Sequence, residues 1–319
     1  MIAKQKNILK ALAIVIGLAV VVHAAWRFPW HLTRDALLSA NIKILLIALG
    51  INLVSLLVKG WSWHLLLKPV APNRWKVAQE ANLIGATVNC LSVSFAGEAA
   101  RIHLIAKRDS VPLQVAIASV FWARGVETAG LVLFLLIAPG LLELPPAVRG
   151  AQIGAAGLLV ILLCLILFRR GWRLPSWVPH FLSSTLNPLA EIGSVRNLVL
   201  PMVFALVNWA AQWATFHLVL LALDARPSLE ASFMALLATN LGGLLRLTPA
   251  NVGVFQVAMV AALLPFGIAS DQAMAASLTL QGIQVIPVVA MGFALGGWKA
   301  LNQVRTEKLK QVDTRPISF

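Results

Sequence analysis

A polar stretch separates two long apolar segments at residues 92–108, where the chain reads Ser92-Val93-Ser94-Phe95-Ala96-Gly97-Glu98-Ala99-Ala100-Arg101-Ile102-His103-Leu104-Ile105-Ala106-Lys107-Arg108. Its small and hydroxyl residues predict a helix break from Ser92 to Gly97. Glu98 and Arg101 then open a new helix and, being three residues apart, share one face of it. Charge beside a break in a membrane segment is costly unless it lines a cavity or meets a partner. The stretch therefore indicates either a polar site within the membrane or a loop at its surface.

The composition is that of a membrane protein. Hydrophobic residues make up 59% of the 319 residues and charged residues only 12%, whereas about a quarter of the residues of a soluble domain are charged. Several mostly apolar runs reach the roughly 18 residues that a helix needs to cross a bilayer. They do not alternate apolar and polar residues, which excludes a membrane barrel. We expect an all-α polytopic membrane protein whose residues 1–319 form a single integral membrane domain.

The net charge of +14 reflects topology more than nucleic-acid binding. Most cations flank apolar runs, as the positive-inside rule requires, and the same residues would attract anionic lipid headgroups. Cys90 and Cys164 lie far apart in apolar segments and indicate neither a disulfide nor a metal site. Eight tryptophans near segment ends fit an interfacial belt: Trp26, Trp30, Trp61, Trp63, Trp75, Trp172, Trp177 and Trp298.

Hydropathy and charge together predict about six full crossings with both ends in the cytoplasm of a cell inner membrane. The crossings are residues 11–25, 42–67, 113–138, 151–168, 197–223 and 273–298. The first of them would alternatively be a cleaved secretory signal. The connection after it is expected to be a short external loop. Residues 172–196 should lie along the inner interface, and residues 299–319 form a cytoplasmic tail.

Two further apolar segments are short and broken, and each predicts a re-entrant helical hairpin. The first enters from the cytoplasm over residues 77–95 and turns near Ser94 and Gly97. The second enters from outside over residues 230–247 and 252–264, where Pro249 and Gly253 prevent a continuous helix. Residues 42–138 and 197–298 would then share the order span, hairpin, span with opposite orientation. This pattern predicts an inverted-topology repeat whose broken helices meet at the midplane.

The charged residues near these breaks are the candidate site. Arg124 and Glu127 lie near the centre of the 113–138 span, on one face, where an unpaired charge costs roughly 2.5–3.5 kcal/mol. Arginine side chains at helix breaks suit a phosphate group, and the expected substrate-binding residues are Glu98, Arg101, Arg124, Glu127, Arg246, Thr248, Asn251 and Gln256. The alternative is that these polar groups only hold the broken helices together. Lys59 is expected to snorkel to the cytoplasmic interface.

Catalytic and metal-binding sequence patterns are absent, so we expect a protein that is not an enzyme and that needs no cofactor or metal. Glu98 and Glu127 could form an acid–base pair, but each has an arginine three residues away and charge neutralisation is the simpler interpretation. Gly292-x-x-x-Gly296 and Gly150-x-x-x-Gly154 leave a homo-oligomer open.

Short motifs resemble the flippase-like membrane domain family, which is the transmembrane region of lysylphosphatidylglycerol synthase and its stand-alone relatives. The first is Gly97-Glu98-x-x-Arg101 followed by a basic cluster, and the second is Arg124-x-x-Glu127. The third, Pro249-x-x-x-Gly253-Val254-Phe255-Gln256, is similar to the family's Pro-Gly-Gly-x-Gly-x-x-Glu hinge. The resemblance covers about residues 10 to 300.

The chain departs from the family pattern at several positions. Ala250-Asn251 replaces the usual paired glycines, Gln256 the common Glu, and Ala123 a usually acidic residue. The aminoacyltransferase domain of the two-part synthases is missing, so lipid aminoacylation is not expected. The resemblance implies translocation of lipids with large or charged headgroups, such as aminoacyl-phosphatidylglycerol, polyprenyl-phosphate-linked glycans or hopanoid-type lipids. The rival functions are an intramembrane transferase on lipid-linked substrates and a lipid-binding scaffold.

Overall fold

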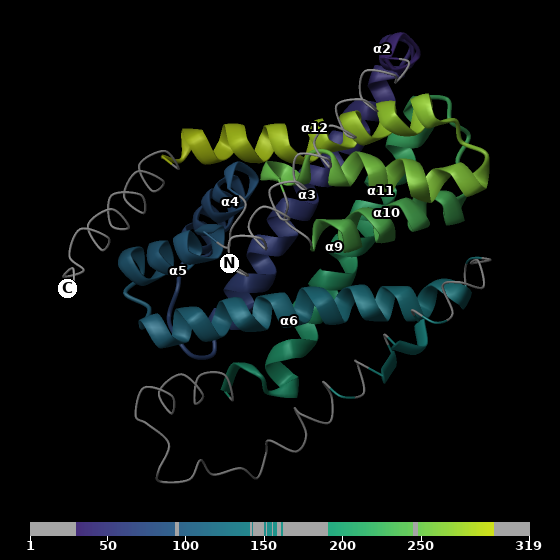
Figure 1. Ribbon diagram of the computed structural model, residues 1–319. Coiled ribbons are helices and arrows are strands. Elements are labelled where there is room, and N and C mark those ends of the chain that lie inside the picture. The colour runs from purple at the N-terminus through teal and green to yellow at the C-terminus, as the bar shows by residue number, and fades with distance from the viewer. Residues whose placement is uncertain are drawn as a thin grey trace, which may run out of the picture.

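The computed structural model describes residues 30–92, 96–140, 142, 150, 152–154, 156–157, 161, 191–244 and 248–296. Throughout this part of the chain the regular structure is helical, which confirms the all-α membrane architecture. Two long helices, α6 (Leu113–Ile137) and α12 (Ser270–Ala294), run across opposite sides of the molecule (Figure 1). Two pairs of shorter helices lie between them at opposite ends, with α3 (Ile42–Leu67) and α9 (Val195–Ala222) crossing the middle.

Helix α3 has the predicted bounds, and its start has a local cause. The side chain of Asn41 accepts hydrogen bonds from the backbone N–H groups of Lys43 at 3.1 Å and Ile44 at 3.4 Å, which satisfies two of the free donors at the helix end. The segment before it was predicted to be a loop, and this is wrong in part, because residues Trp30–Leu38 form helix α2. Thr33 of α2 is buried at 2% exposure and donates to the carbonyl of Asp271, at the start of α12.

Helices α4 (Trp75–Leu91) and α5 (Ala96–Arg108) form the first hairpin and pack against each other. Their outer ends meet, because the guanidinium of Arg74 donates to Asp109 at 2.8 Å and to the carbonyl of Arg108 at 3.0 Å. At 1.5 Å per residue the 13 residues of α5 reach about 20 Å, less than the roughly 30 Å of a bilayer core. The hairpin therefore begins and ends at the same end of the molecule.

The break in this hairpin lies earlier than predicted. Helix α4 ends at Leu91 and α5 already begins at Ala96, so Gly97 lies in the first turn of α5 rather than in the hinge. A Cβ at Gly97 would collide with the carbonyl oxygen of Gly85 and the side chain of Asn89, both on α4. The glycine is needed for close contact between the two arms.

The second hairpin consists of α10 (Leu229–Gly243) and α11 (Val254–Leu263), joined through the short helix η3 (Pro249–Asn251). Ala250 has φ 51°, Asn251 φ 56° and Gly253 φ 90°. These are left-handed values that glycine adopts without strain, while asparagine tolerates them better than alanine does. Ala250 and Asn251, which stand where the resembling family hinge has paired glycines, therefore have backbone angles that favour glycine.

Two large hydrophobic cores and two smaller clusters lie within the described residues. One joins α9, α10, α11 and α12 around Phe216, Leu236 and Met259. The other joins α3, α4, α5 and α6 around Trp63, Ala78 and Ile105. The packing between α3 and α9 connects the two large cores, and the smaller cluster around Leu135 and Phe233 also joins α6 to α10.

Five helical segments of the described residues are long and apolar enough to cross a membrane: Ile42–Leu67, Leu113–Ile137, Val195–Ala222, Pro249–Phe266 and Ser270–Ala294. The fourth combines η3, which was predicted as the hinge, with α11 and the terminal turn η4 (Leu264–Phe266), which cover the predicted second arm 252–264. A further turn, η1 (Ala138–Gly140), follows α6. The chain is thus a multi-pass membrane protein.

Some predictions fall outside the described residues. These are the crossing at 11–25, most of the crossing at 151–168, the cytoplasmic tail 299–319 and most of the interfacial segment 172–196. The last two residues of that segment belong to α9, which begins at Val195. The inverted repeat stays a prediction, although the described helices follow the order long helix, short pair, long helix twice.

Candidate functional site

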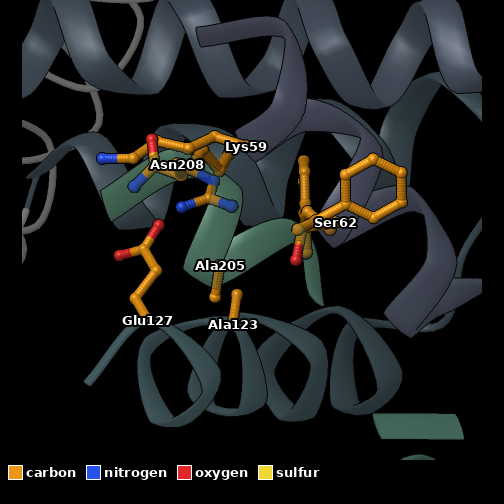
Figure 2. Close-up of a pocket in the computed structure, with 9 residues that line it drawn as sticks. Lys59, Ser62, Ala123, Glu127, Ala205 and Asn208 are labelled. Atoms are coloured by element: carbon orange, nitrogen blue, oxygen red, sulfur yellow. The ribbon is translucent and has the colours of Figure 1, made fainter. Parts of the chain in front are cut away.

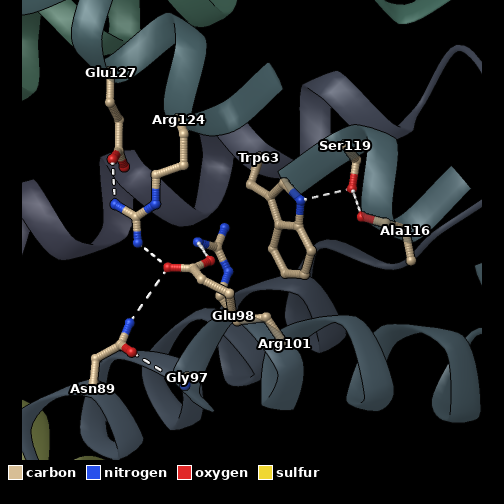
Figure 3. A network of polar contacts seen from close by, with 9 residues as sticks. All are labelled: Trp63, Asn89, Gly97, Glu98, Arg101, Ala116, Ser119, Arg124 and Glu127. Atoms are coloured by element: carbon tan, nitrogen blue, oxygen red, sulfur yellow. Dashed lines mark hydrogen bonds and ion pairs between the residues drawn. The ribbon is translucent and has the colours of Figure 1, made fainter. Parts of the chain in front are cut away.

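Four charged side chains from α5 and α6 form one network beside the first hairpin (Figure 3). Arg101 donates to Glu98 at 3.2 Å on α5, and Arg124 donates to Glu127 at 2.8 Å on α6. The guanidinium of Arg124 also pairs with Glu98 and so bridges the two helices. The i,i+3 spacing read from the sequence places each pair on one face, and the packing of α5 on α6 joins the pairs.

Helices α4 and α3 both contact this network. Asn89 of α4 donates to Glu98 at 3.4 Å and accepts from the backbone N–H of Gly97 at 3.1 Å, which anchors the start of α5. Trp63 of α3 lies under the guanidinium of Arg101, whose central carbon is 4.4 Å from the ring centroid. A cation over an aromatic face is attracted to its negative quadrupole, more strongly when water is excluded.

Trp63 is itself fixed, which contradicts its predicted place in an interfacial belt. Its side chain is only 1% exposed, and its indole N–H donates to Ser119 at 3.0 Å (Figure 3). Ser119 in turn donates to the carbonyl of Ala116 at 2.8 Å. The tryptophan is therefore a rigid support for Arg101 and not a membrane-surface anchor.

Helix α9 closes the other side of the site. Trp209 donates its indole N–H to the carbonyl of Glu127 at 2.9 Å, and a Cβ at Gly130 would lie 2.8 Å from the Cβ of Ala205. Because a glycine permits this close approach, α6 and α9 bring their backbones together next to Glu127. The position of Glu127 thus depends on α9 as well as on its own helix.

A small pocket opens between α3, α5, α6 and α9 (Figure 2). Its lining combines charged and polar groups with a few apolar ones: Lys59, Ser62, Trp63, Arg101, Ala123, Glu127, Phe204, Ala205 and Asn208. In Figure 2 the carboxylate of Glu127 points from α6 toward Lys59 and Asn208. Lys59 is half-buried and lines this pocket, and its predicted snorkelling to the interface stays a prediction.

The predicted residues of the second hinge form a separate cluster. Gln256 accepts from the backbone N–H of Gly253 at 2.7 Å and donates to Gln281 of α12, also at 2.7 Å. Gln281 donates to the carbonyl of Ala250 at 2.8 Å. These hydrogen bonds connect η3 and the start of α11 to α12, so Gln256 stabilises the turn at residues with left-handed backbone angles.

Thr248 and Asn251 are also engaged locally. Thr248 donates to the carbonyl of Val252 at 2.6 Å, and Asn251 donates to the carbonyl of Gly243 at 3.4 Å. Within the described residues no hydrogen bond joins them or Gln256 to the Glu98 network, although η3 does pack against α4. Pro249 lies in η3, whereas Arg246 and Ser94 lie outside the described residues.

Three residues that the sequence analysis did not place in the site belong to it: Lys59, Trp63 and Asn208. Lys59 and Trp63 are four residues apart and therefore share a face of α3, which is a signal that the sequence contained. The burial of Asn208 depends on how α9 crosses α3, and no pattern along the sequence fixes that crossing.

Comparison with known families agrees with the resemblance seen in the motifs. The family model described as "Lysylphosphatidylglycerol synthase TM region" matches residues 10–292. The matched range contains every charged residue of the network and both hairpins. No curated protein matches the chain.

Proposed function

Because the chain belongs to the family of the lysylphosphatidylglycerol synthase TM region, we propose that it translocates lipids with charged or sugar-bearing headgroups across the inner membrane. Aminoacyl-phosphatidylglycerol, polyprenyl-phosphate-linked glycans and hopanoid-type lipids are the candidate substrates. The protein would act without chemical conversion of the lipid. Its driving force would be an ion gradient, the membrane potential or consumption of the lipid after transfer.

The observation that carries this proposal is the charge network next to a polar pocket inside a helical membrane domain. The Arg101 side chain is 6% exposed and that of Glu98 is 12% exposed. Ionised groups are rare at membrane depth and mostly mark pathways for polar substrates. Broken helices around such groups are the common arrangement in secondary transporters.

In the proposed mechanism the headgroup enters between α5, α6 and α9 while the acyl or prenyl chains stay in lipid. Arg101 faces the pocket and would meet the anionic part of the headgroup. Glu98 and Glu127 hold Arg124 between them, and so keep the hairpin and α6 in register. The polar groups replace the hydration that the headgroup loses on leaving water.

The arrangement of the first hairpin supports a cytoplasmic entrance. Its two outer ends meet at Arg74 and Asp109, next to the Arg108–Glu80 ion pair. Cations gathered at one end of a membrane domain favour the cytoplasmic side. We propose that this end and both chain termini face the cytoplasm.

Reconstitution in liposomes tests the proposal. Headgroup-labelled anionic lipid would be followed through the access of an external quencher, with the wild type, Arg124→Ala and the control Arg226→Ala. Arg226 is an exposed arginine whose side chain is 88% accessible and lies outside the network. We expect fast exchange in the wild type and the control and at least ten-fold slower exchange in Arg124→Ala, at unchanged lipid mass.

Other outcomes would redirect the proposal. Normal exchange by a correctly inserted Arg124→Ala protein would reject the site. A changed lipid mass would favour the transferase, and no exchange with any lipid would favour the scaffold.

A further inference from the structure

The pocket between α3, α5, α6 and α9 contains buried polar atoms without partners. Both the amide nitrogen and the amide oxygen of Asn208 lack a hydrogen bond among the described residues, and so does Nε of Arg101. Asn208 is 2% exposed and Arg101 is 5% exposed. A buried polar group left without a partner costs about 1–3 kcal/mol, so such groups are usually satisfied by a water, an ion or a ligand.

A third donor faces the same space. The side chain of Lys59 lines the pocket and interacts electrostatically with the Glu127 carboxylate, but no hydrogen bond from its ammonium is formed with the residues that the structure describes. The pocket therefore presents a lysine, an arginine N–H and an amide N–H together. Each is a hydrogen-bond donor, and two of them carry positive charge.

The charges around the pocket do not cancel. Lys59, Arg101 and Arg124 contribute three positive charges, and Glu98 and Glu127 contribute two negative ones, which leaves +1. Both carboxylates are already engaged, Glu98 by two arginines and Glu127 by Arg124 and, electrostatically, by Lys59. An excess charge away from bulk water is stabilised by a counter-ion of the opposite sign.

The size of the pocket limits what can enter. Its free volume is about 10 Å³, which is roughly the space of one water molecule or one oxygen atom of a larger group. A single phosphate oxygen fits this volume, while the rest of the group would lie outside it. Its short hydrogen bonds to charged donors are among the strongest that proteins make.

We propose that Lys59, Arg101 Nε and Asn208 form an oxyanion site for one phosphate oxygen of a singly charged phosphate group. The group comes from a lipid headgroup phosphodiester or from free phosphate. Arg124, held between two carboxylates, orders the site without contacting the anion. This inference rests on the proposed function for its physiological meaning, but its test does not.

Binding to the purified protein in detergent tests the site by isothermal titration calorimetry. The probes are a short-chain phosphatidylglycerol, inorganic phosphate, and the diacylglycerol with the same chains but no phosphate. We expect phosphatidylglycerol to bind and Lys59→Gln to weaken it about ten- to hundred-fold, the usual effect of losing a charged hydrogen bond. Lys59→Arg should retain binding, and Lys43→Gln, an exposed lysine on the same helix α3, should leave it unchanged.

The two sources of the anion give different results. Binding of phosphatidylglycerol alone would assign the site to a lipid headgroup, whereas binding of both phosphate compounds would extend it to the free anion. Equal binding of the diacylglycerol, or unchanged affinity in Lys59→Gln, would overturn the proposal.

Asn208→Leu separates a ligand site from a structural role. The two side chains have similar size, and leucine removes the unpartnered amide. We expect the ligand-free protein to unfold at the same or a higher temperature, and phosphatidylglycerol to bind about ten-fold more weakly. Lower thermal stability with unchanged affinity would show that the amide has a structural role and would reject the site.

Failure of this inference and failure of the proposed function are distinguishable. Normal lipid exchange by Lys59→Gln would reject the phosphate site and leave translocation standing. If the wild type bound phosphatidylglycerol in a Lys59-dependent way but exchanged no lipid, the phosphate site would stand and translocation would be rejected.

Discussion

Replacing Glu98 by glutamine should destabilise the protein strongly, because this carboxylate is the shared partner of two arginines. It pairs with Arg101 at 3.2 Å and with Arg124 across the helix interface, and Asn89 adds a hydrogen bond. Removing one member of a buried ion pair typically costs about 3–5 kcal/mol, since the opposite charge is left buried. We expect Glu98→Gln and Arg101→Met each to lower the free energy of unfolding by an amount of this order.

The double variant carries the sharper test. With both Glu98 and Arg101 neutral, no uncompensated charge is left from their pair, so the combined loss should be smaller than the sum of the single losses. Coupling between contacting residues is about 0.5–3 kcal/mol, and a pair this deeply buried should lie in the upper part of that range. Denaturant unfolding in detergent, followed by the fluorescence of the 11 tryptophans, would measure the cycle.

Glu80→Gln is the matched control for this cycle. Glu80 pairs with Arg108, but these side chains are 21% and 41% exposed, and accessible ion pairs contribute only about 0–1 kcal/mol. Equal losses for Glu98→Gln and Glu80→Gln, or strictly additive losses in the cycle, would refute the idea that the network is held together by buried charge.

Two further predictions concern packing around the site. Gly97→Ala should lower the free energy of unfolding by about 1–3 kcal/mol, because the new methyl group would overlap the carbonyl oxygen of Gly85. The control Gly50→Ala has open space around it and should leave the unfolding temperature unchanged or raise it. Equal unfolding temperatures for the two variants would contradict the close contact of α4 and α5. Trp63→Phe should cost about 1–3 kcal/mol through the loss of the donor to Ser119; an unchanged unfolding temperature would show that this bond does not fix the tryptophan.

The long apolar helices could be predicted because burial in lipid leaves a direct mark on the sequence. A crossing helix needs about 20 apolar residues and satisfies its own backbone hydrogen bonds, so hydropathy alone locates it. The predicted bounds of 42–67 match α3, and those of 113–138 differ from α6 by one residue. The predicted family was also confirmed. It could be predicted because its motifs contain charged residues, which are unusual within apolar segments.

The details of the break and the pocket could not be predicted, because they depend on contacts between helices. Gly97 in a polar stretch resembles a hinge, and only the approach of α4 shows that it is a packing position. Lys59 and Trp63 lie near the end of an apolar run, which is also where snorkelling lysines and interfacial tryptophans occur. A local sequence pattern cannot separate these cases, whereas the contacts of α3 with α5, α6 and α9 do.

The crossing of α3 with α9 also links the site to the rest of the fold. On α3, Ala48 belongs to the core shared with α10, α11 and α12, and Trp63 to the core shared with α4, α5 and α6. On α9, Trp209 belongs to the first of these cores and Ala205 to the second. Close-packed cores move as units rather than deforming continuously. Lys59 on α3 and Asn208 on α9 line the pocket from two helices that each contribute to both cores, so the relative placement of the two cores sets the distance between these two sides of the pocket.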